Sequence, residues 1–583
     1  MTIIYRAVIC FILICGALAV DAPSGAVLAQ DDGAQDAGGR IAFVAFKNGQ
    51  WDIFSISAAG DDLRQVTNDS YEDDQPAYSP DGGRLAYASR REGNWDIYLL
   101  DLASGEETRL TDHPDYDGAP AWHPDGNQIA FESYRGRDLD LWLLDLTAES
   151  SPVSLTSDSA AGEFDPAWDD QGRRLFFASW RFGDNDIWAL TLDTNELVQI
   201  TETPASDSQP AWNPFDQTLA FTRNTLGDKD IFVLADKGET ESAEQWSWLG
   251  SLEGATFSPD GGSLVGYYQR REGAQLVRLD GGDPVPYFLT EPAILRQTTT
   301  WHSQPIVFGQ PALTLHNEDG DGLYTETLTP SASPYGEPYD LIRINDLQTG
   351  TPWLADTVEE SYQAWRMQLR DEVGYDFLGE VSETLRPINF SSDVSQYSSW
   401  HKSGRAVDTL FDLPGGRMQI VRQNISGETY WRTLLRCEDQ SGRCGRPTTA
   451  NPWNYSYQAR AVIAPEQGGI ENPNLYGYWV DFTELGELYG WRRIASFDDE
   501  EFSWTWHFIA FEYWHYQKMP PTRTKGLDSG WYQAMKDVYP PHEVETYFTW
   551  EQMRAAGEAP YLIVAKGVPL PPAAERWQQR LVP

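Results

Sequence analysis

Basic residues and cysteines are scarce in this sequence of 583 residues. Its 43 lysines and arginines stand against 88 aspartates and glutamates, a formal net charge of −45, which argues against nucleic-acid partners and anionic lipid surfaces. Four cysteines are too few for a scaffold held together by disulfides. Aromatic residues are abundant instead, with 24 Trp, 28 Tyr and 24 Phe. We therefore expect a folded chain of roughly two to four domains.

The N-terminal sequence has the pattern of an export signal. Arg6 precedes an apolar run from Ala7 to Val20 that is short for a membrane span. Val27 and Ala29 are the small residues that a signal peptidase requires, so residues 1–29 are predicted to be a cleaved signal peptide. The alternative is an uncleaved anchor, the one case in which we expect contact with a membrane. The protein is thus expected in the periplasm, the cell wall or the extracellular space.

Export also bears on the cysteines. Cys10 and Cys15 would be removed with the signal, which leaves Cys437 and Cys444 on either side of a polar turn. Because exported chains meet oxidising conditions, these two are predicted to form a local disulfide that closes a hairpin.

Two sequence patterns recur across residues 40–300. One is an aspartate followed by two apolar residues, repeated about every 44 residues; its copies begin at Asp52, Asp96, Asp140, Asp186 and Asp230. The other is a Pro-Ala-aromatic segment that leads into a turn, as in PAYSPDG from Pro76 to Gly82, followed by alternating stretches such as RLAYAS. Alternating apolar residues between Asp-Gly turns are typical of hairpin strands, and the repeat length suits a four-stranded blade.

The phase of the repeats predicts how the ring of blades closes. The first blade begins at GRIAFVAF without its Pro-Ala-aromatic strand, and the stretch from Thr298 to Gly309 has the right spacing to supply it, with Trp301 in the aromatic position. We therefore predict a six-bladed β-propeller over residues 40–309. The repeats resemble those of TolB-type propellers over about residues 40–305, and this resemblance implies a docking surface for a protein partner.

The aromatic residues of the repeat have two interpretations. Trp122, Trp168 and Trp212 could stack on a sugar or a peptide, but their repeated position favours packing between blades. The repeated Asp-Gly pairs are likewise interpreted as turn residues, and so is the DGDG sequence from Asp319 to Gly322, which lacks the rest of a calcium loop.

In the second half of the sequence, the repeats are replaced by a mixture of helix and strand patterns. Residues 310–355 are predicted to be a linker region, and from Asp356 apolar residues at steps of three and four predict an amphipathic helix that stops at Gly374. A hairpin pattern before Cys437 and a helix-then-strand pattern after Val480 follow. Residues 356–583 are therefore predicted to form an α+β domain.

Two motifs in this domain point to a metal site. Ser399, His401, Gly404, Ala406 and Asp408 form S-x-H-x-x-G-x-A-x-D, and much later Glu512, Trp514 and His515 form E-x-W-H. Together they resemble the signatures of zinc D-Ala-D-Ala carboxypeptidases, whose fold is shared with the hedgehog signalling domain.

This resemblance implies a zinc cofactor held by His401, Asp408 and His515, with Glu512 as the catalytic base. Chemistry agrees, because two imidazoles and a carboxylate are suitable zinc ligands and a nearby carboxylate can take a proton. The family also uses an arginine to stabilise the oxyanion, for which Arg386 is preferred to Arg405. A further position, that of Ser399, contacts substrate in the family, although a serine there could equally hydrogen-bond the backbone.

Some alternatives remain open. His507 could compete as a ligand, and Asp408 could cap a turn. Glu512 and His515 share a face on a helix, whereas a regular strand would need a bend to bring them together. The leading hypothesis is an exported zinc metallopeptidase that cleaves D-Ala-type peptides of the cell wall, with peptide or peptidoglycan as substrate and the propeller as a docking module. The rival is a non-catalytic binding or scaffold protein of the cell envelope that keeps a zinc site.

Overall fold

The computed structural model describes most of the chain from residue 39 onward. The described ranges are 39–303, 341–390, 398–450, 452–454, 470–471, 475–496, 512–519 and 530–571, without 149, 158, 184, 236–241, 272 and 282–284. The predicted signal peptide, most of the predicted linker with its DGDG sequence, and His507 lie outside these ranges. No helix in the described ranges is long and apolar enough to span a membrane.

The repeats form six four-stranded antiparallel sheets within the described residues. Four of these sheets begin with a Pro-Ala-aromatic strand, and in five of them the third strand carries the repeated aspartate. The strands of the five complete sheets are β4 (Asp73–Tyr78), β5 (Arg84–Ser89), β6 (Asp96–Asp101), β7 (Glu107–Arg109), β8 (Asp117–Trp122), β9 (Gln128–Ser133), β10 (Asp140–Asp145), β11 (Val153–Ser154), β12 (Glu163–Trp168), β13 (Arg174–Ser179), β14 (Asp186–Thr191), β15 (Glu196–Gln199), β16 (Ser206–Asn213), β17 (Thr218–Thr225), β18 (Asp228–Ala235), β19 (Glu244–Gln245), β20 (Leu252–Phe257), β21 (Ser263–Arg270), β22 (Gly273–Asp280) and β23 (Tyr287–Phe288).

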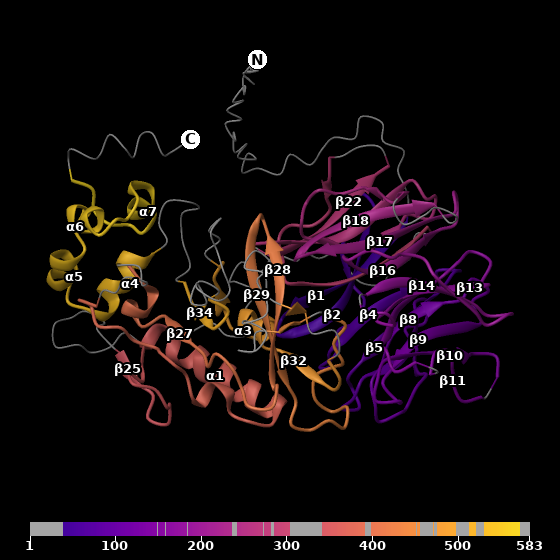
Figure 1. Cartoon of the computed structure of the whole chain (residues 1–583), viewed down its shortest axis with the longest axis horizontal. Coiled ribbons are helices and arrows are strands. Elements are labelled where there is room, and N and C mark those ends of the chain that lie inside the picture. The colour runs from indigo at the N-terminus through magenta and orange to yellow at the C-terminus, as the bar shows by residue number, and fades with distance from the viewer. Residues whose placement is uncertain are drawn as a thin grey trace, which may run out of the picture. The chain divides into compact units, whose positions relative to one another are not determined.

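The remaining sheet joins the two ends of the repeat region. It contains β1 (Arg40–Lys47), β2 (Gln50–Ser57), β3 (Arg64–Gln65) and β24 (Leu295–His302), with β24 paired to β1. Trp301 lies opposite Ile41 in this pairing, and the first strands of successive sheets contact one another around the ring, β24 included. The strand begins three residues before the predicted start at Thr298, and residues 304–309 lie outside the described ranges. The N-terminal half is therefore an all-β, propeller-like region closed by a shared sheet (Figure 1).

Hydrogen bonds between neighbouring blades explain the bulge in each Pro-Ala-aromatic strand. The register shifts inside each Pro-Ala-aromatic strand, and the residue at the shift has a positive φ, for instance 54° at Gln75 and at Gln209. A β-bulge of this kind turns a side chain out of the ladder. Gln75 Oε1 accepts a hydrogen bond from the backbone N–H of Ala119, and Gln209 Oε1 accepts one from that of Gly254, each in the next blade, both at 2.9 Å.

The repeated tryptophans pack between blades. Trp122 and Trp168 are buried, and Trp212 packs partly buried against the core. The indole N–H of Trp122 donates to the carbonyl of Ala77 at 3.0 Å, and that of Trp168 donates to the carbonyl of Ala121 at 3.1 Å. Each acceptor belongs to the preceding sheet, so these rings are positioned by the fold.

The C-terminal half is mixed, with short strands and helices. The amphipathic helix is present as α1 (Asp356–Val373), with Gly374 in the left-handed conformation at its end, and Figure 1 shows α4 to α7 gathered at the end of the chain. The other elements are β25 (Leu341–Arg343), β26 (Trp353–Ala355), η2 (Phe377–Gly379), η3 (Trp400–Ser403), β27 (Ala406–Asp408), β28 (Met418–Ile425), β29 (Glu428–Arg436), β30 (Trp453–Asn454), β31 (Ile470–Glu471), β32 (Trp479–Asp481), α3 (Phe482–Leu488), β33 (Arg492–Arg493), β34 (His515–Gln517), α4 (Trp531–Val538), α5 (Pro541–Tyr547), α6 (Trp550–Ala555) and α7 (Pro560–Ala565).

A long hairpin in this half leads into the loop that carries the disulfide. β28 and β29 pair over their whole length around a turn at Ser426 and Gly427. Cys437, directly after β29, is joined to Cys444 by a disulfide with a Cα–Cα distance of 6.1 Å. This bond closes the polar loop after the hairpin rather than the hairpin itself.

Buried ion pairs join the two halves. Asp74 of β4, which is 1% exposed, accepts hydrogen bonds from Arg296 of β24 and from Arg446 of the C-terminal half, both at 2.9 Å. Arg296 also pairs with Glu484 of α3 at 2.9 Å. One hydrophobic cluster includes buried side chains from both halves, such as Tyr116 and Tyr478. The propeller therefore shares a core and a charge network with the rest of the chain.

Candidate metal centre

His401, Asp408 and His515 come together in the C-terminal half. One donor atom of each lies within 4.8 Å of the other two, and within the described residues no other group of three His, Cys, Asp or Glu side chains has this arrangement. The side chains are buried, with 0% of His401 exposed and 7% of Asp408 and His515.

Strand pairing places two of the three ligands. β27 runs antiparallel to β34, and Asp408 lies directly opposite His515. Residues opposite each other in an antiparallel pair project their side chains to the same face, about 5 Å apart. The motif residue His401 arrives from η3, the turn immediately before β27.

The rest of the first motif shapes the turn that carries His401. The Ser399 side chain accepts a hydrogen bond from the His401 backbone N–H at 3.3 Å, so it caps η3. Gly404 ends the turn with a φ of 65°, and a Cβ there would lie 2.8 Å from the backbone nitrogen of Ala355. The Ser399 contact with the backbone is the second of the two roles considered for this residue. Its predicted contact with substrate stays a prediction.

The three donor atoms face one another closely. His401 Nε2 lies 3.2 Å from His515 Nδ1 and 3.1 Å from Asp408 Oδ1, and His515 Nδ1 lies 2.8 Å from the same oxygen. The opposite ring nitrogens have acceptors of their own. His401 Nδ1 is 2.7 Å from the carbonyl oxygen of Thr384, and His515 Nε2 is 3.3 Å from Gln517 Oε1. With hydrogens on these two nitrogens, His401 Nε2 and His515 Nδ1 can each offer a lone pair to a cation.

Three lone pairs therefore point at a common space. Three acceptors cannot satisfy one another, and a cation between them would satisfy all three. Two imidazoles held by outer hydrogen bonds, together with a carboxylate, form a ligand set that fits zinc with a further position open for another ligand. Thr384 and Gln517 are outer-shell residues that sequence reasoning missed. Gln517 had a signal, because it lies two residues after His515 in one strand, whereas the Thr384 carbonyl had none.

The pKa values of Asp408 and His515 are shifted in the directions expected for a carboxylate next to imidazoles. Burial by itself raises the pKa of Asp408, but the adjacent His401 and His515 outweigh it and hold this pKa well below its usual range. Burial by itself lowers the pKa of His515, and the contacts with Asp408 raise it by more.

Glu512 begins the turn that leads into β34. It has a φ of 53°, and its carbonyl accepts a hydrogen bond from the His515 N–H at 3.0 Å. The bend expected for a strand arrangement is therefore a tight turn, with Glu512 outside the strand. Burial raises the pKa of the Glu512 carboxyl, which also interacts electrostatically with His515, Asp408 and Arg386.

Arg386 and Arg405 occupy different places. Arg386 Nη2 lies 2.6 Å from Glu383 and 3.6 Å from Asp408, and it interacts with Glu512. Arg405 instead binds the carbonyl of Lys518 at 2.9 Å and the hydroxyl of Thr357 at 2.6 Å. Of the two arginines considered, the structure brings Arg386 to the cluster.

Comparisons with known proteins bear on the first half. Residues 34–150 match the model of the TolB beta propeller domain. The region is also similar to TolB from Acinetobacter baumannii, with 19% identity over 46% of this chain and 67% of that one and a TM-score of 0.42.

Two further solved structures show similarity over part of the chain. A putative TolB from Agrobacterium tumefaciens has 16% identity over 46% of this chain and 99% of that one, with a TM-score of 0.36. A puromycin-hydrolyzing peptidase from Mycobacterium tuberculosis has 16% identity over 43% and 45%, with a TM-score of 0.33. The comparison with curated proteins gave no match. The match to the TolB beta propeller domain thus covers the first part of the repeat region, residues 34–150.

Proposed function

We propose that the chain is an exported zinc metallopeptidase that cleaves D-Ala-type peptides of the cell wall. The observation that carries this proposal is the close approach of three donor atoms, one each from His401, Asp408 and His515. The Glu512 carboxylate and the Arg386 guanidinium interact electrostatically with this cluster. His401, Asp408 and His515 would hold the zinc, which would act as a Lewis acid toward the peptide carbonyl.

Two neighbouring residues would supply the other steps of hydrolysis, which are proton transfer and stabilisation of the oxyanion. Glu512 is half-buried, burial raises its pKa, and it would take a proton from water and deliver it to the leaving amine. Arg386, held by Glu383, would place its positive charge against the oxygen that becomes negative as the carbonyl is attacked.

The propeller would serve to dock this site to a wall or protein partner. Part of its surface is already used internally, since Asp74 and Arg296 bind residues of the C-terminal half. The docking surface would therefore involve other parts of the ring.

Metal content and hydrolysis test the proposal together. We expect the purified chain to bind one zinc and to release D-Ala from a D-Ala-D-Ala peptide. His515→Ala should lose the zinc. Glu512→Gln should keep the zinc and lose activity by about 10²- to 10⁴-fold. The matched control is His542→Ala, an exposed histidine on α5, which should leave both unchanged.

Each contrary result has a defined meaning. A chain that binds no zinc, or a Glu512→Gln variant with full activity, contradicts the mechanism. Zinc binding without turnover of any D-Ala peptide would favour the rival hypothesis of a non-catalytic envelope protein.

A further inference from the structure

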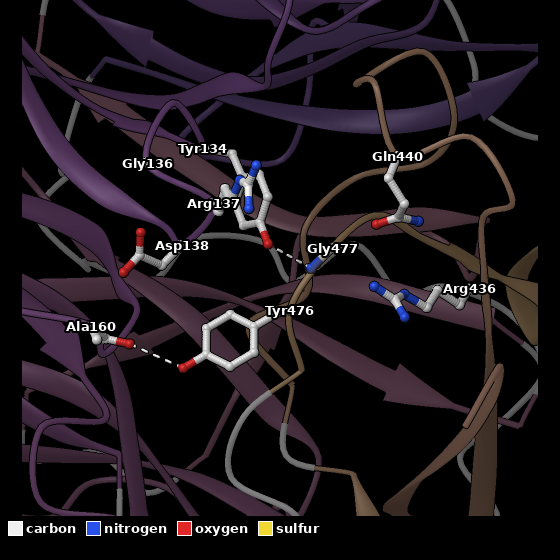
Figure 2. Close-up of a pocket in the computed structure, with 9 residues that line it drawn as sticks. All are labelled: Tyr134, Gly136, Arg137, Asp138, Ala160, Arg436, Gln440, Tyr476 and Gly477. Carbon is white, nitrogen blue, oxygen red and sulfur yellow. Dashed lines mark hydrogen bonds between the residues drawn. The ribbon is translucent and has the colours of Figure 1, made fainter. Parts of the chain in front are cut away.

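A cavity of about 640 Å³ lies between a propeller turn and the C-terminal half, and it shares no residue with the metal centre. Its volume is in the range of small-molecule sites. Figure 2 shows the residues that line it, which come from two distant parts of the sequence: Tyr134, Gly136, Arg137, Asp138 and Ala160 from the propeller, and Arg436, Gln440, Tyr476 and Gly477 from the other half.

Three charged side chains in this cavity are unpaired. Arg137, Asp138 and Arg436 form no ion pair with one another or with any other described residue. Arg436 Nε is also buried without a hydrogen-bond partner among those residues. The cavity thus holds charges of both signs that are kept apart.

The backbone at Arg137 gives an independent indication. The residue three positions before the repeated aspartate is a glycine with positive φ in four other blades: Gly49 at 87°, Gly93 at 91°, Gly183 at 103° and Gly227 at 100°. In this blade the position is Arg137, with a φ of 79°. A long side chain is strained in this conformation, and such strain is typical of binding sites. The exception to the repeat places a guanidinium in the cavity.

Each of the two tyrosines is hydrogen-bonded to the half of the chain opposite its own. The Tyr476 hydroxyl donates to the carbonyl of Ala160 at 3.1 Å, and the Tyr134 oxygen accepts from the Gly477 N–H at 2.6 Å (Figure 2). Burial raises the pKa of Tyr134, which also interacts electrostatically with Asp138 and Arg436. Asp138 and Arg436, which are opposite in charge, line the cavity together with this ring.

We propose that this cavity binds a short peptide with free termini, whose carboxylate meets Arg436 and Arg137 and whose ammonium meets Asp138. Guanidinium groups match a carboxylate in geometry as well as charge. A zwitterion satisfies both signs of charge at once. It is also neutral overall, so the net charge of −45 does not repel it.

Calorimetric titration of the full chain with tri-alanine tests this proposal. The chain is first treated with a chelator so that peptide binding to zinc does not contribute. We expect saturable binding that is weakened at least about tenfold by N-acetylation or by C-amidation of the peptide, because each removes one charged contact. His515→Ala should bind tri-alanine like the unmodified chain.

Variants locate the site. Arg436→Gln and Asp138→Asn should each weaken binding at least about tenfold, whereas the exposed controls Arg173→Gln and Asp193→Asn should not change it. Arg137→Gly restores the residue of the other blades. It should weaken binding while leaving the melting temperature equal or higher, a combination that a purely structural arginine would not produce.

The outcomes that overturn the proposal are equally definite. They are no saturable binding up to about 10 mM tri-alanine, equal affinity for peptides with blocked termini, or unchanged affinity in folded Arg436→Gln and Asp138→Asn variants. Loss of binding in His515→Ala would assign the peptide to the metal centre instead.

Discussion

Gly404 shows how a single residue without a side chain positions His401. It ends η3 with a φ of 65°, its N–H donates to the His401 carbonyl, and an added Cβ would lie 2.8 Å from the Ala355 nitrogen. The conformation and the contact both disfavour any larger residue.

Gly404→Ala is therefore expected to lower the free energy of unfolding by more than the roughly 1–2 kcal/mol of left-handed strain alone, and to weaken zinc binding. Urea denaturation and zinc titration measure the two effects. Gly415→Ala is the matched control, because Gly415 has a φ of 78° with no atom within 4 Å of an added Cβ. Equal losses in both variants would show that the contact with Ala355 has no effect.

The environment of Asp73 in β4 predicts that the free energy of unfolding depends on pH. Burial raises its pKa to about 7, and Asp69 adds to the rise. Because the folded value lies above that of the unfolded chain, the stabilising contribution is present below pH about 4 and is lost as the pH rises toward 7.

The Asp73→Asn variant should lack this dependence. Urea unfolding at pH 4.5, 6 and 7.5 should show that the unfolding free energy of the unmodified chain falls relative to the variant, by about 1 kcal/mol or more. Asp193→Asn, at an exposed turn, should instead follow the unmodified chain. Parallel curves for the Asp73 variant would contradict the assigned environment.

The resemblance of the two motifs to a known family was enough to predict which side chains would meet. His401 and His515 lie 114 positions apart, yet the resemblance indicated one ligand set that includes both of them and Asp408. The carbonyl of Thr384 could not be predicted in this way, because every residue has a carbonyl and only the fold determines which one meets His401.

At the scale of elements, β24 closes the ring of blades by pairing with β1. It pairs with β1 from Leu295 to His302, and Trp301 packs in a cluster with residues of both terminal sheets. The side chain is 8% exposed. Replacing it removes buried area from the cluster that joins the first and last repeats.

Trp301→Ala should therefore lower the free energy of unfolding by about 3–5 kcal/mol, as for other buried tryptophans. Trp248→Ala is the control, because that side chain is 66% exposed, and it should change stability by less than about 0.5 kcal/mol. Thermal or urea unfolding of the full chain gives both values. A small loss at Trp301 would mean that the closing strand contributes little to stability.

Element types followed from local pattern where the pattern was strong. Period-two stretches gave the strands, and Gly374 marked the end of α1. The tight turn at Glu512 could not be predicted, because the aromatic sequence around it is typical of a strand. The positive φ of Glu512 turns the backbone before β34 begins at His515, so that Glu512 lies outside the strand. Local propensity gave no reason to expect that conformation.

At the scale of the molecule, a charge network holds the two halves together. Burial by itself raises the pKa of Glu484, but Arg296 and other arginines lower it to about 2. Its folded value lies below the ordinary 4.5, so its stabilising contribution is present above pH about 4.5 and is lost as the pH falls toward 2.

Glu484→Gln should lower the unfolding free energy by about 3 kcal/mol at pH 7, since it leaves Arg296 with fewer partners. The difference from the unmodified chain should shrink as the pH is lowered from 5 to 3, measured by urea unfolding. Glu202→Gln, at an exposed position, should show no such trend. A constant difference across this range would contradict the role given to Glu484.

The contact between the halves lay beyond sequence reasoning. Asp74 and Arg446 are separated by 372 positions, and neither stands out in its segment. The cavity is similar, because Arg137 could have been recognised as a departure from the repeat glycine but Arg436 and Tyr476 could not have been assigned to it. Long-range partners of this kind depend on how whole elements pack.

The shared first blade also sets an order of events during synthesis. Arg40 is among the first residues of the ring to be translated, and its partner His302 is among the last. Until that residue emerges, β1 has an open edge, which is a site for mispairing and aggregation. A chain interrupted before Leu295 would carry five complete blades and an unfinished sixth. The ring is therefore completed only after its whole length has been made.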